Sequence, residues 1–417
     1  MKQIIDMLFG AEHYFRRFFR WLALAMLVGC VCGLVGSAFH IVVARVTSIR
    51  GNDPWLVYLL PVGGLVIAAL YRVTKTEGEG TNNIIDSIHF GEKVPLLLVP
   101  VIFIATAITH LLGGSAGREG AALQIGGGIG FHIGRLFDLD EKDMRLVTLC
   151  GMSAVFAALF GTPLTAAVFA LEVISVGILH YSGLVPCLVA SLVAYAISRL
   201  LGIEPMRFIL AAEPLDVLML IRVSLLAVTC AVVSIVFCVA MHKTEHYAQK
   251  LIKNTFLRAF IGGIIIIVIG LILGTDIYYG TGEDLIASAL TGGAVPDWAF
   301  LWKIVLTAVT IGFGFRGGEI VPTFFIGAAL GCVLGPVFGM SSQLAAAIGL
   351  AAMFCGAVNC PIASILLSVE LFGAGGLIYF ALACGISYTL SGYFGIYSSQ
   401  KIMYSKTRAE FINRFAN

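Results

Sequence analysis

Long stretches without charged residues constrain this chain more than any other feature of its sequence. Spanning a lipid bilayer takes about 20 apolar residues. Several runs of about that length or more contain no Asp, Glu, Lys or Arg: Trp21–Ala44, Val94–Gly117, Leu146–Leu171, Val173–Ser198 and Val223–Met241. Only 12% of the residues are charged, compared with roughly 25% in soluble domains. We therefore predict a polytopic membrane protein, and the net charge of +2 provides no basic surface for nucleic acid.

Clusters of basic residues predict the orientation of the chain. They lie before the first apolar run, near the middle of the chain and after the last run: Arg16, Arg17 and Arg20; Lys243, Lys250, Lys253 and Arg258; and Lys401, Lys406, Arg408 and Arg414. Because Lys and Arg are enriched in cytoplasmic loops, all three clusters and both termini are expected in the cytoplasm. The cysteines and histidines show no metal-site spacing, so we expect neither a metal nor a cofactor.

Glycine and proline interrupt the apolar runs. The chain has 48 glycines, and Pro163, Pro322 and Pro361 divide long runs into short pieces. Within a membrane, broken helices occur only where other protein segments cover them or where they line a polar cavity. This pattern is typical of a transport pathway.

Matching segments indicate an internal duplication. Gly78–Gly80 matches Gly280–Gly282, Gly117–Gly126 matches Gly318–Gly327, and Pro163–Glu172 matches Pro361–Glu370, with offsets of 202, 201 and 198 residues. The offsets are similar and the order is the same, which a chance match would not give. In transporters built from two such halves, the binding site lies at their interface. Whether the halves are inverted depends on the number of spans, which the broken helices leave open.

Glu119 is the first candidate for a functional residue. It follows the glycine-rich segment Gly113–Gly117 and begins an apolar helix, where free N–H groups and the helix dipole stabilise a carboxylate. The same donors bind an anion when the carboxylate moves aside. Glu119 is therefore suited to compete with an anion and to leave the site when it is protonated. The alternative is an ordinary helix cap.

Glu319 occupies the corresponding helix start in the second half. It lies between Gly318 and a long stretch, Ile320–Gln400, in which Glu370 is the only charged residue, so we expect it to be buried. The duplication makes Glu319 a candidate proton carrier or hydrogen-bond donor. The alternative is an ion pair with Arg316.

Other polar residues near the apolar runs have more than one interpretation. Asn82 and Asn83 precede an apolar segment; Asn is a good N-cap, but its amide N–H groups are also suited to contact a dehydrated anion. Tyr397 follows the last span, where it is either a membrane-interface anchor or a ligand. Glu172 and Glu370 are expected at helix ends and are assigned no chemistry.

These residues resemble motifs of the CLC family of chloride channels and anion/proton antiporters, over nearly the whole chain. Gly117–Gly120 is similar to the family's G-[KR]-E-G-P segment, which bears the gating glutamate, although Ala121 replaces the proline. Gly318–Pro322 is similar to G-x-F-x-P, and the segment around Tyr397 looks like the place of the anion-coordinating tyrosine. The resemblance implies that Glu119 gates the pathway and transfers protons and that Glu319 is a central glutamate. The anion-binding residues that it implies are Thr81, Asn82, Asn83, Gly117, Arg118, Gly120, Gly318, Ile320, Val321 and Tyr397.

The same resemblance implies a fold and an assembly. The fold is all-α and polytopic, with about 18 mostly broken or tilted helices in two inverted-repeat halves. We expect a single transport domain over residues 1–417, with a first repeat at 21–201, a second repeat at 216–392, a C-terminal cytoplasmic helix at 393–417 and no soluble regulatory domain. The family implies a homodimer with an independent pathway in each subunit, and the expected location is a bacterial cytoplasmic (inner) membrane.

Departures from the chloride-selective members indicate fluoride. Those members have a G-S-G-I-P loop whose serine touches the anion; here the serine falls on Asn82, or on Thr81 if the register slips by one. Glu319 replaces an apolar residue, and their internal proton glutamate falls on Val173. These changes resemble the fluoride/proton antiporter branch, although that branch often has Thr where this chain has Val321. Because fluoride holds its water tightly, strong donors such as an Asn amide and a protonated Glu favour its binding.

The sequence therefore predicts export of fluoride in exchange for protons, which would confer fluoride resistance. A chloride channel or chloride/proton antiporter of the same fold is the main alternative. Which of Thr81, Asn82 and Asn83 contacts the anion stays open. A membrane enzyme with Glu119 and Glu319 as an acid/base pair is disfavoured because no Ser/His or metal constellation accompanies them. A receptor would be expected to have a sizeable soluble domain.

Overall fold

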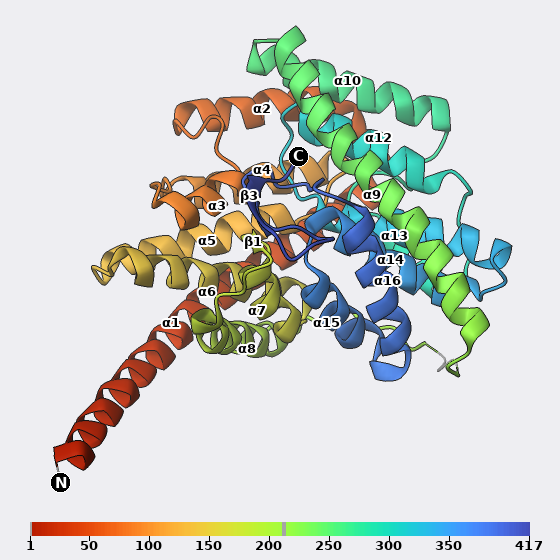
Figure 1. The fold of residues 1–417 in the computed structure, drawn as a ribbon. Coiled ribbons are helices and arrows are strands. Elements are labelled where there is room, and N and C mark those ends of the chain that lie inside the picture. The colour runs from red at the N-terminus through yellow and green to blue at the C-terminus, as the bar shows by residue number, and fades with distance from the viewer. Residues whose placement is uncertain (1, 211–213) are drawn as a thin grey trace.

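The fold is known from a computed structural model, which describes residues 2–210 and 214–417, with side chains from residue 14 onward. This part of the chain forms 16 α-helices, three short 3-10 helices and three short strands (Figure 1). The α-helices before residue 211 are α1 (Lys2–Asn52), α2 (Leu60–Val73), α3 (Thr81–Phe90), α4 (Leu98–Leu111), α5 (Glu119–Leu136), α6 (Glu141–Phe160), α7 (Pro163–Glu172) and α8 (Leu184–Leu200). Those after residue 213 are α9 (Val217–Leu251), α10 (Thr255–Leu273), α11 (Glu283–Thr291), α12 (Ala299–Gly312), α13 (Ile320–Val337), α14 (Ser342–Val358), α15 (Pro361–Phe372) and α16 (Leu377–Leu390). The 3-10 helices are η1 (Pro54–Leu59), η2 (Tyr181–Gly183) and η3 (Ala374–Gly376).

Both long and short apolar helices occur in the chain. Among the described residues, 7 helical stretches are long and apolar enough to cross a membrane. The other apolar helices, such as α4, α7, α12 and α15, have only 10–17 residues, which is less than the roughly 20 needed for a full crossing. Pro163 and Pro361 are the first residues of α7 and α15, where a missing N–H has no cost. The predicted broken helices are therefore confirmed.

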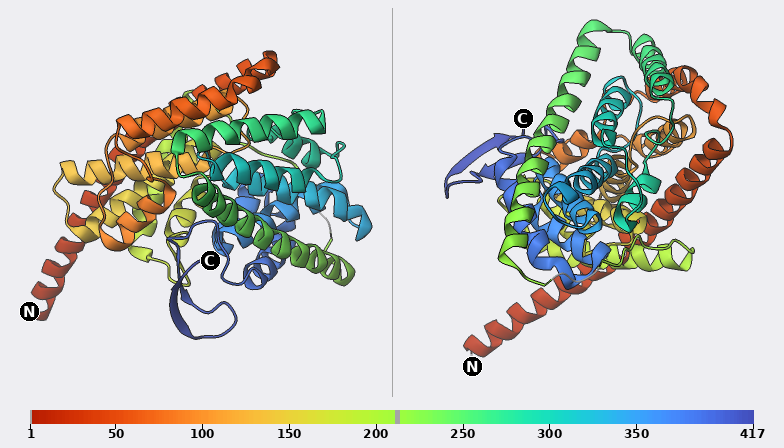
Figure 2. Two further views of the ribbon diagram at one scale, coloured as in Figure 1. Left: turned by 90° about the horizontal axis from the view of Figure 1, so that it is seen from above. Right: turned by 90° about the vertical axis from the view of Figure 1, so that its right-hand side faces the viewer.

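The two halves repeat the same packing. Helix α5 packs on α6 and α13 packs on α14, and α5 and α13 both have 18 residues. In Figure 1 and in the left view of Figure 2, most of the first half lies on the left and most of the second half on the right, while α2 of the first half packs against α10 of the second. The all-α fold with two related halves agrees with the prediction, while the boundaries 21–201 and 216–392 stay predictions.

Two glutamates, one in each half, each cap the N-terminus of a helix in the other half. Glu172, at the end of α7, accepts hydrogen bonds from the N–H groups of Ile362 (3.1 Å) and Ala363 (2.8 Å) at the start of α15. Glu370, near the end of α15, accepts from Leu164 (3.0 Å) and Thr165 (2.8 Å) at the start of α7. Each carboxylate therefore satisfies the free donors of the opposite helix. Because each C-terminal end meets the other helix's N-terminal end, α7 and α15 lie antiparallel, as expected of inverted halves.

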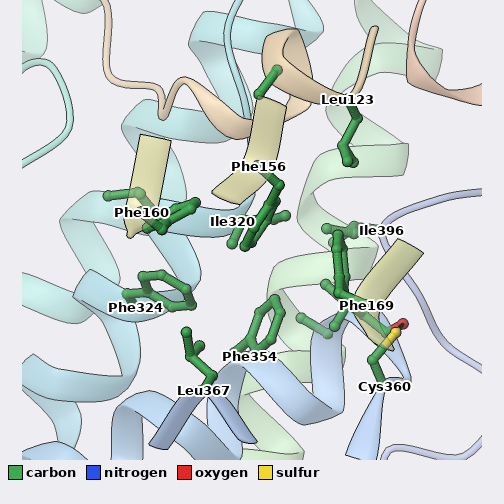
Figure 3. Close-up of a cluster of buried hydrophobic side chains, with 14 of the residues drawn as sticks. Leu123, Phe156, Phe160, Phe169, Ile320, Phe324, Phe354, Cys360, Leu367 and Ile396 are labelled. Carbon is green, nitrogen blue, oxygen red and sulfur yellow. Dashed lines mark hydrogen bonds between the residues drawn. The ribbon is translucent and has the colours of Figure 1, made fainter. Parts of the chain in front are cut away.

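A ring of phenylalanines joins the halves in the core. Ring centroids lie 4.6 Å apart for Phe156–Phe160, 5.8 Å for Phe160–Phe324, 5.2 Å for Phe324–Phe354, 5.8 Å for Phe354–Phe169 and 5.0 Å for Phe169–Phe156. Figure 3 shows these side chains pointing toward one another from both halves. Aromatic rings at these separations attract one another beyond their simple burial. The cluster fixes α6 and α7 against α13 and α14.

The predicted C-terminal helix at 393–417 is wrong. The segment instead forms β2 (Lys401–Tyr404) and β3 (Phe411–Phe415), which pair antiparallel, while β2 pairs in parallel with β1 (Ser175–Val176) after α7. The aromatic and β-branched residues of this segment favour strands. Gly392 and Gly395, which lie between α16 and β2, disfavour a continued helix. The small sheet ties the C-terminal segment to the first half.

Candidate functional site

The two halves meet at a crossing made of backbone alone. The N–H of Gly117 donates to the carbonyl of Gly318, and the N–H of Gly318 donates to the carbonyl of Gly117, both at 2.7 Å. A Cβ on Gly318 would lie 2.4 Å from the nitrogen of Gly120, and one on Gly120 would lie 3.0 Å from the carbonyl oxygen of Gly317. Glycine is required here because the backbones approach too closely for side chains. The starts of α5 and α13 are thereby brought together.

Glu119 lies in a site built from N–H groups of both halves. Its Oε2 atom accepts hydrogen bonds from the N–H of Arg118 (3.0 Å) and from the N–H of Val321 in α13 (3.2 Å). Its Oε1 atom has no hydrogen-bond partner in the described part of the chain, and the residue is fully buried. The carboxylate thus stands where an anion would gain the same donors. Glu119 does cap a helix, but it is the helix of the opposite half.

Glu319 is the N-cap residue of α13 and lines a cavity of about 170 Å³. Its Oε2 atom is buried without a hydrogen-bond partner among the described residues. Within residues 14–210 and 214–417, Glu319 forms no ion pair with Arg316. The Arg316 guanidinium lies instead over the ring of Tyr71, 4.2 Å from its centroid. The alternative of a Glu319–Arg316 pair therefore finds no support in this geometry, and Glu319 is left available to a ligand.

Asn82 and Asn83 line the same cavity but make different contacts. The Oδ1 atom of Asn83 accepts a hydrogen bond from the N–H of Gly80 (2.8 Å), so Asn83 caps α3 from its third residue, while the N-cap position considered for Asn from the sequence is occupied by Gly80. The Oδ1 atom of Asn82 accepts from the N–H of Ser399 (3.2 Å). Because the oxygen of Asn82 is engaged across the cavity, its NH₂ group is the part directed to other partners.

Thr81 connects the cavity to the crossing. Its hydroxyl donates to the carbonyl of Gly120 (3.3 Å) and accepts from the side chain of Gln124 (3.1 Å). Gln124 lines the cavity, and its buried oxygen has no partner among the described residues. The sequence analysis did not single out Gln124. One feature of the sequence could have identified it: Gln124 is the only polar side chain between Glu119 and His132.

Tyr397 lies in the cavity wall rather than at a membrane interface. The residue is only 2% exposed, and its hydroxyl has no hydrogen-bond partner in the described part of the chain. The following turn is held by Gln400, whose side chain donates to the carbonyls of Val173 (2.8 Å) and Val358 (2.9 Å). An unpartnered buried hydroxyl beside a cavity is a candidate donor for a ligand.

The structure thus brings all predicted site residues to one region, in two groups. Gly117, Arg118, Glu119, Gly120, Gly318, Ile320 and Val321 form the crossing, and Thr81, Asn82, Asn83, Glu319 and Tyr397 lie at the cavity. The side chain of Ile320 belongs to the hydrophobic cluster of Figure 3 and not to the cavity lining. For Val321 the observed contact is its backbone N–H, so the departure from Thr leaves that contact unchanged.

Comparisons with known proteins identify the family of the chain. The family model for the voltage gated chloride channel matches residues 63–392. The chloride/fluoride channel protein of Pseudomonas syringae pv. tomato is 37% identical over 396 residues, which cover 93% of this chain and 87% of the relative. The voltage-gated ClC-type chloride channel ClcB of Escherichia coli is 24% identical over 410 residues, covering 89% and 96%.

Solved structures share the fold. A crystal structure of a CLC-type fluoride/proton antiporter has a TM-score of 0.89 and 32% identity, covering 92% of this chain and 98% of that one. A slow cyanobacterial Cl⁻/H⁺ antiporter has a TM-score of 0.75 and 21% identity, covering 89% and 94%, and supports the fold alone. With a family model matching most of its length and relatives above 30% identity, this chain belongs to the voltage-gated chloride channel (CLC) family of membrane anion transport proteins.

Proposed function

We propose that this protein exports fluoride from the cytoplasm in exchange for protons. The observation that carries the proposal is the position of Glu119, whose carboxylate accepts from the N–H of Val321 across the interface of the halves. The similarity to a CLC-type fluoride/proton antiporter and to a chloride/fluoride channel protein supports the same function. A transporter needs no covalent chemistry, so no enzymatic activity is proposed.

Glu119 supplies the link between the two flows. While it is ionised, it occupies the N–H groups that an anion would use. When it is protonated, these donors hold it less strongly, because a neutral acid gains less from the N–H groups and the helix dipole. The side chain then leaves with its proton, and an anion takes its place. Exchange follows because proton and anion alternate at one site.

The cavity residues favour fluoride over chloride. A small anion loses strong hydration when it enters, and only strong hydrogen bonds offset that loss. Asn82, Tyr397 and a protonated Glu319 present such donors around one cavity. We assign the contact to Asn82 rather than to Asn83, because Asn83 caps its own helix. The backbones of the crossing and Thr81 complete the proposed anion path.

The proposed setting is a bacterial inner membrane, with both termini in the cytoplasm and two copies of the chain in a homodimer. The cavity at Glu319 is bordered by His242 and Glu245 of α9, close to the basic cluster that begins at Lys243, and therefore faces the cytoplasm. Helix α1 continues from Arg20 to Arg50, roughly 45 Å at 1.5 Å per residue, so Arg50 lies on the external side. Anions thus reach the site from the cytoplasmic cavity.

Transport by purified protein in liposomes tests the function. Vesicles loaded with fluoride or with chloride are diluted into a solution without the ion, and selective electrodes follow the anion and the external pH. We expect fluoride efflux much faster than chloride efflux, with proton uptake that stops when fluoride is absent. Equal chloride efflux with proton movement would favour a chloride/proton antiporter, and anion efflux without protons would favour a channel.

A further inference from the structure

The duplicated halves place different side chains at corresponding helix starts. Helix α3 begins at Thr81 after Gly80, and α11 begins at Glu283 after Gly282. Since the repeat matches Gly80 with Gly282, Glu283 corresponds to Thr81 and Asp284 corresponds to Asn82. The cytoplasmic cavity thus has neutral donors where the opposite side has carboxyl groups. Neutral donors suit an anion, and carboxyl groups suit a proton.

Glu283 shares one guanidinium with Glu119. Its Oε1 atom lies 3.0 Å from Nη2 of Arg118, and Nε of the same arginine lies 4.0 Å from Oε1 of Glu119. The three side chains differ in their access to water: Glu283 is 34% exposed, Arg118 is 5% exposed and Glu119 is buried. A partly exposed carboxyl group and a buried one are therefore linked through a buried cation, and the Oε1 atoms of both glutamates lack a hydrogen-bond partner among the described residues.

Glu283 also lines a second cavity, of about 550 Å³, on the side to which Arg50 belongs. Lys303 of α12 holds the loop that precedes α11. This residue is fully buried, and its ammonium group donates to the loop carbonyls of Tyr278 (3.2 Å) and Gly280 (2.7 Å). The charged and titratable groups around Glu283 are Arg118 at the N-cap of α5, Arg50 of α1, Asp276 and Tyr279 of the loop, Asp284 of α11 and Lys303 of α12. Glu283 is the carboxylate among them that is paired with Arg118.

We propose that Glu283 passes external protons to Glu119 and that Arg118 holds the two carboxyl groups close together. Glu283 takes a proton from water in the second cavity and donates it, directly or through one water, to the carboxylate of Glu119. Glu119 becomes the neutral acid, and Glu283 returns to the carboxylate form, which Arg118 stabilises. This role depends on the proposed fluoride/proton exchange, in which protons are taken up from outside.

The test is the rate of coupled transport as a function of external pH in Glu283→Gln. We expect fluoride export and proton uptake to slow together by roughly tenfold or more near neutral pH, with an unchanged ratio of the two ions, as expected for loss of a proton-transfer group. The defect should shrink as the external pH falls, because protons from solution then reach Glu119 unaided. Asp297→Asn removes an exposed carboxyl group of the loop after α11, outside the lining of this cavity, and should keep the wild-type profile.

Several outcomes would overturn the proposal. A wild-type rate and pH profile in Glu283→Gln would do so, and so would a lower melting temperature with an unchanged rate per folded molecule, since Glu283 would then be structural. If the Gln variant does not fold, Glu283→Asp decides: the shorter carboxylate should be slower with a similar pH profile, and a wild-type rate contradicts the role. A wild-type protein that moves fluoride without protons would instead refute the proposed function, before any variant is compared.

Discussion

The carboxylate of Glu119 is held by N–H groups from both halves, and this arrangement makes a clear prediction for its amide. Glu119→Gln resembles the protonated acid but cannot carry a proton. We expect fluoride gradients to drive no proton movement in this variant, measured with a pH electrode in liposomes. Glu141→Gln, an exposed glutamate in the first turn of α6, is the matched control and should remain coupled. Proton uptake at the wild-type rate in Glu119→Gln would mean that protons travel elsewhere.

Glu319 gives a prediction that separates a ligand from a structural residue. If its carboxyl group donates to fluoride, Glu319→Ala removes a hydrogen bond worth about 1.5–3 kcal/mol, or roughly one to two decades in affinity. Glu319→Gln keeps an N–H donor and should retain part of the binding while losing coupling. Fluoride flux and melting temperature are measured for both variants.

Arg316→Ala is the control for the Glu319 series. Its guanidinium lies over Tyr71 and forms no ion pair with Glu319 among the described residues, so we expect a lower melting temperature with coupling preserved. If all three variants lose stability together while flux per folded molecule stays intact, Glu319 has a structural role and its assignment is wrong.

For single residues, the sequence was a better guide to which residues belong to the candidate site than to the contacts that each of them makes. Glu119 and Glu319 could be found because each lies one or two residues after a glycine, at a matching helix start. Asn82 and Asn83 are adjacent, and both lie in the first turn of α3, so their different roles depend on a distant partner, Ser399. The pairing of Arg118 with Glu283 is likewise set by the packing of the two halves. No local pattern encodes such contacts.

At the scale of helices, we predict that the two capping glutamates contribute unequally to stability. Glu172 is 7% exposed, whereas Glu370 is only partly buried. Removing a buried acceptor leaves donors unsatisfied and costs about 1–3 kcal/mol. We therefore expect Glu172→Ala to lower the melting temperature in detergent more than Glu370→Ala. Glu172→Gln keeps one acceptor oxygen and should lie between Glu172→Ala and the wild type. An equal loss in both Ala variants would contradict the unequal burial.

Helix starts and breaks could be predicted from proline, glycine and the apolar runs, because these signals are local. The C-terminal strands could not. Lys401–Tyr404 becomes a strand because it pairs with Ser175–Val176, which lies far away in the chain. A short segment with few signals of its own takes the structure that its tertiary partners provide. The consequence for the site is direct, since this sheet follows the turn that holds Tyr397.

At the scale of the whole molecule, the repeat accounts for how one chain makes two different cavities, which we propose as separate access routes. The corresponding helix starts line different cavities: Thr81 of α3 contacts Gly120 beside one cavity, and Glu283 of α11 contacts Arg118 beside the other. The duplication was visible in the sequence, but its inversion was not, because short helices hide the number of spans. The exchanged caps between α7 and α15 supply that information.

The orientation of these routes leads to the last prediction. Helix α10 has 19 residues with a mean hydropathy of 2.7, enough for one full crossing. Lys253 and Asp276 are exposed residues beyond its two ends, so they must lie on opposite sides of the membrane. Lys253 belongs to a basic cluster and is therefore expected in the cytoplasm, with Asp276 and the Glu283 cavity outside.

In intact cells, a membrane-impermeant thiol reagent should label Asp276→Cys and not Lys253→Cys, whereas both should be labelled after the cells are opened. The unsubstituted chain is the control for its native cysteines, nine of which are buried and one, Cys30, exposed within an apolar run. Labelling of Lys253→Cys alone in intact cells would reverse the orientation, and with it the assignment of the two cavities to fluoride and protons.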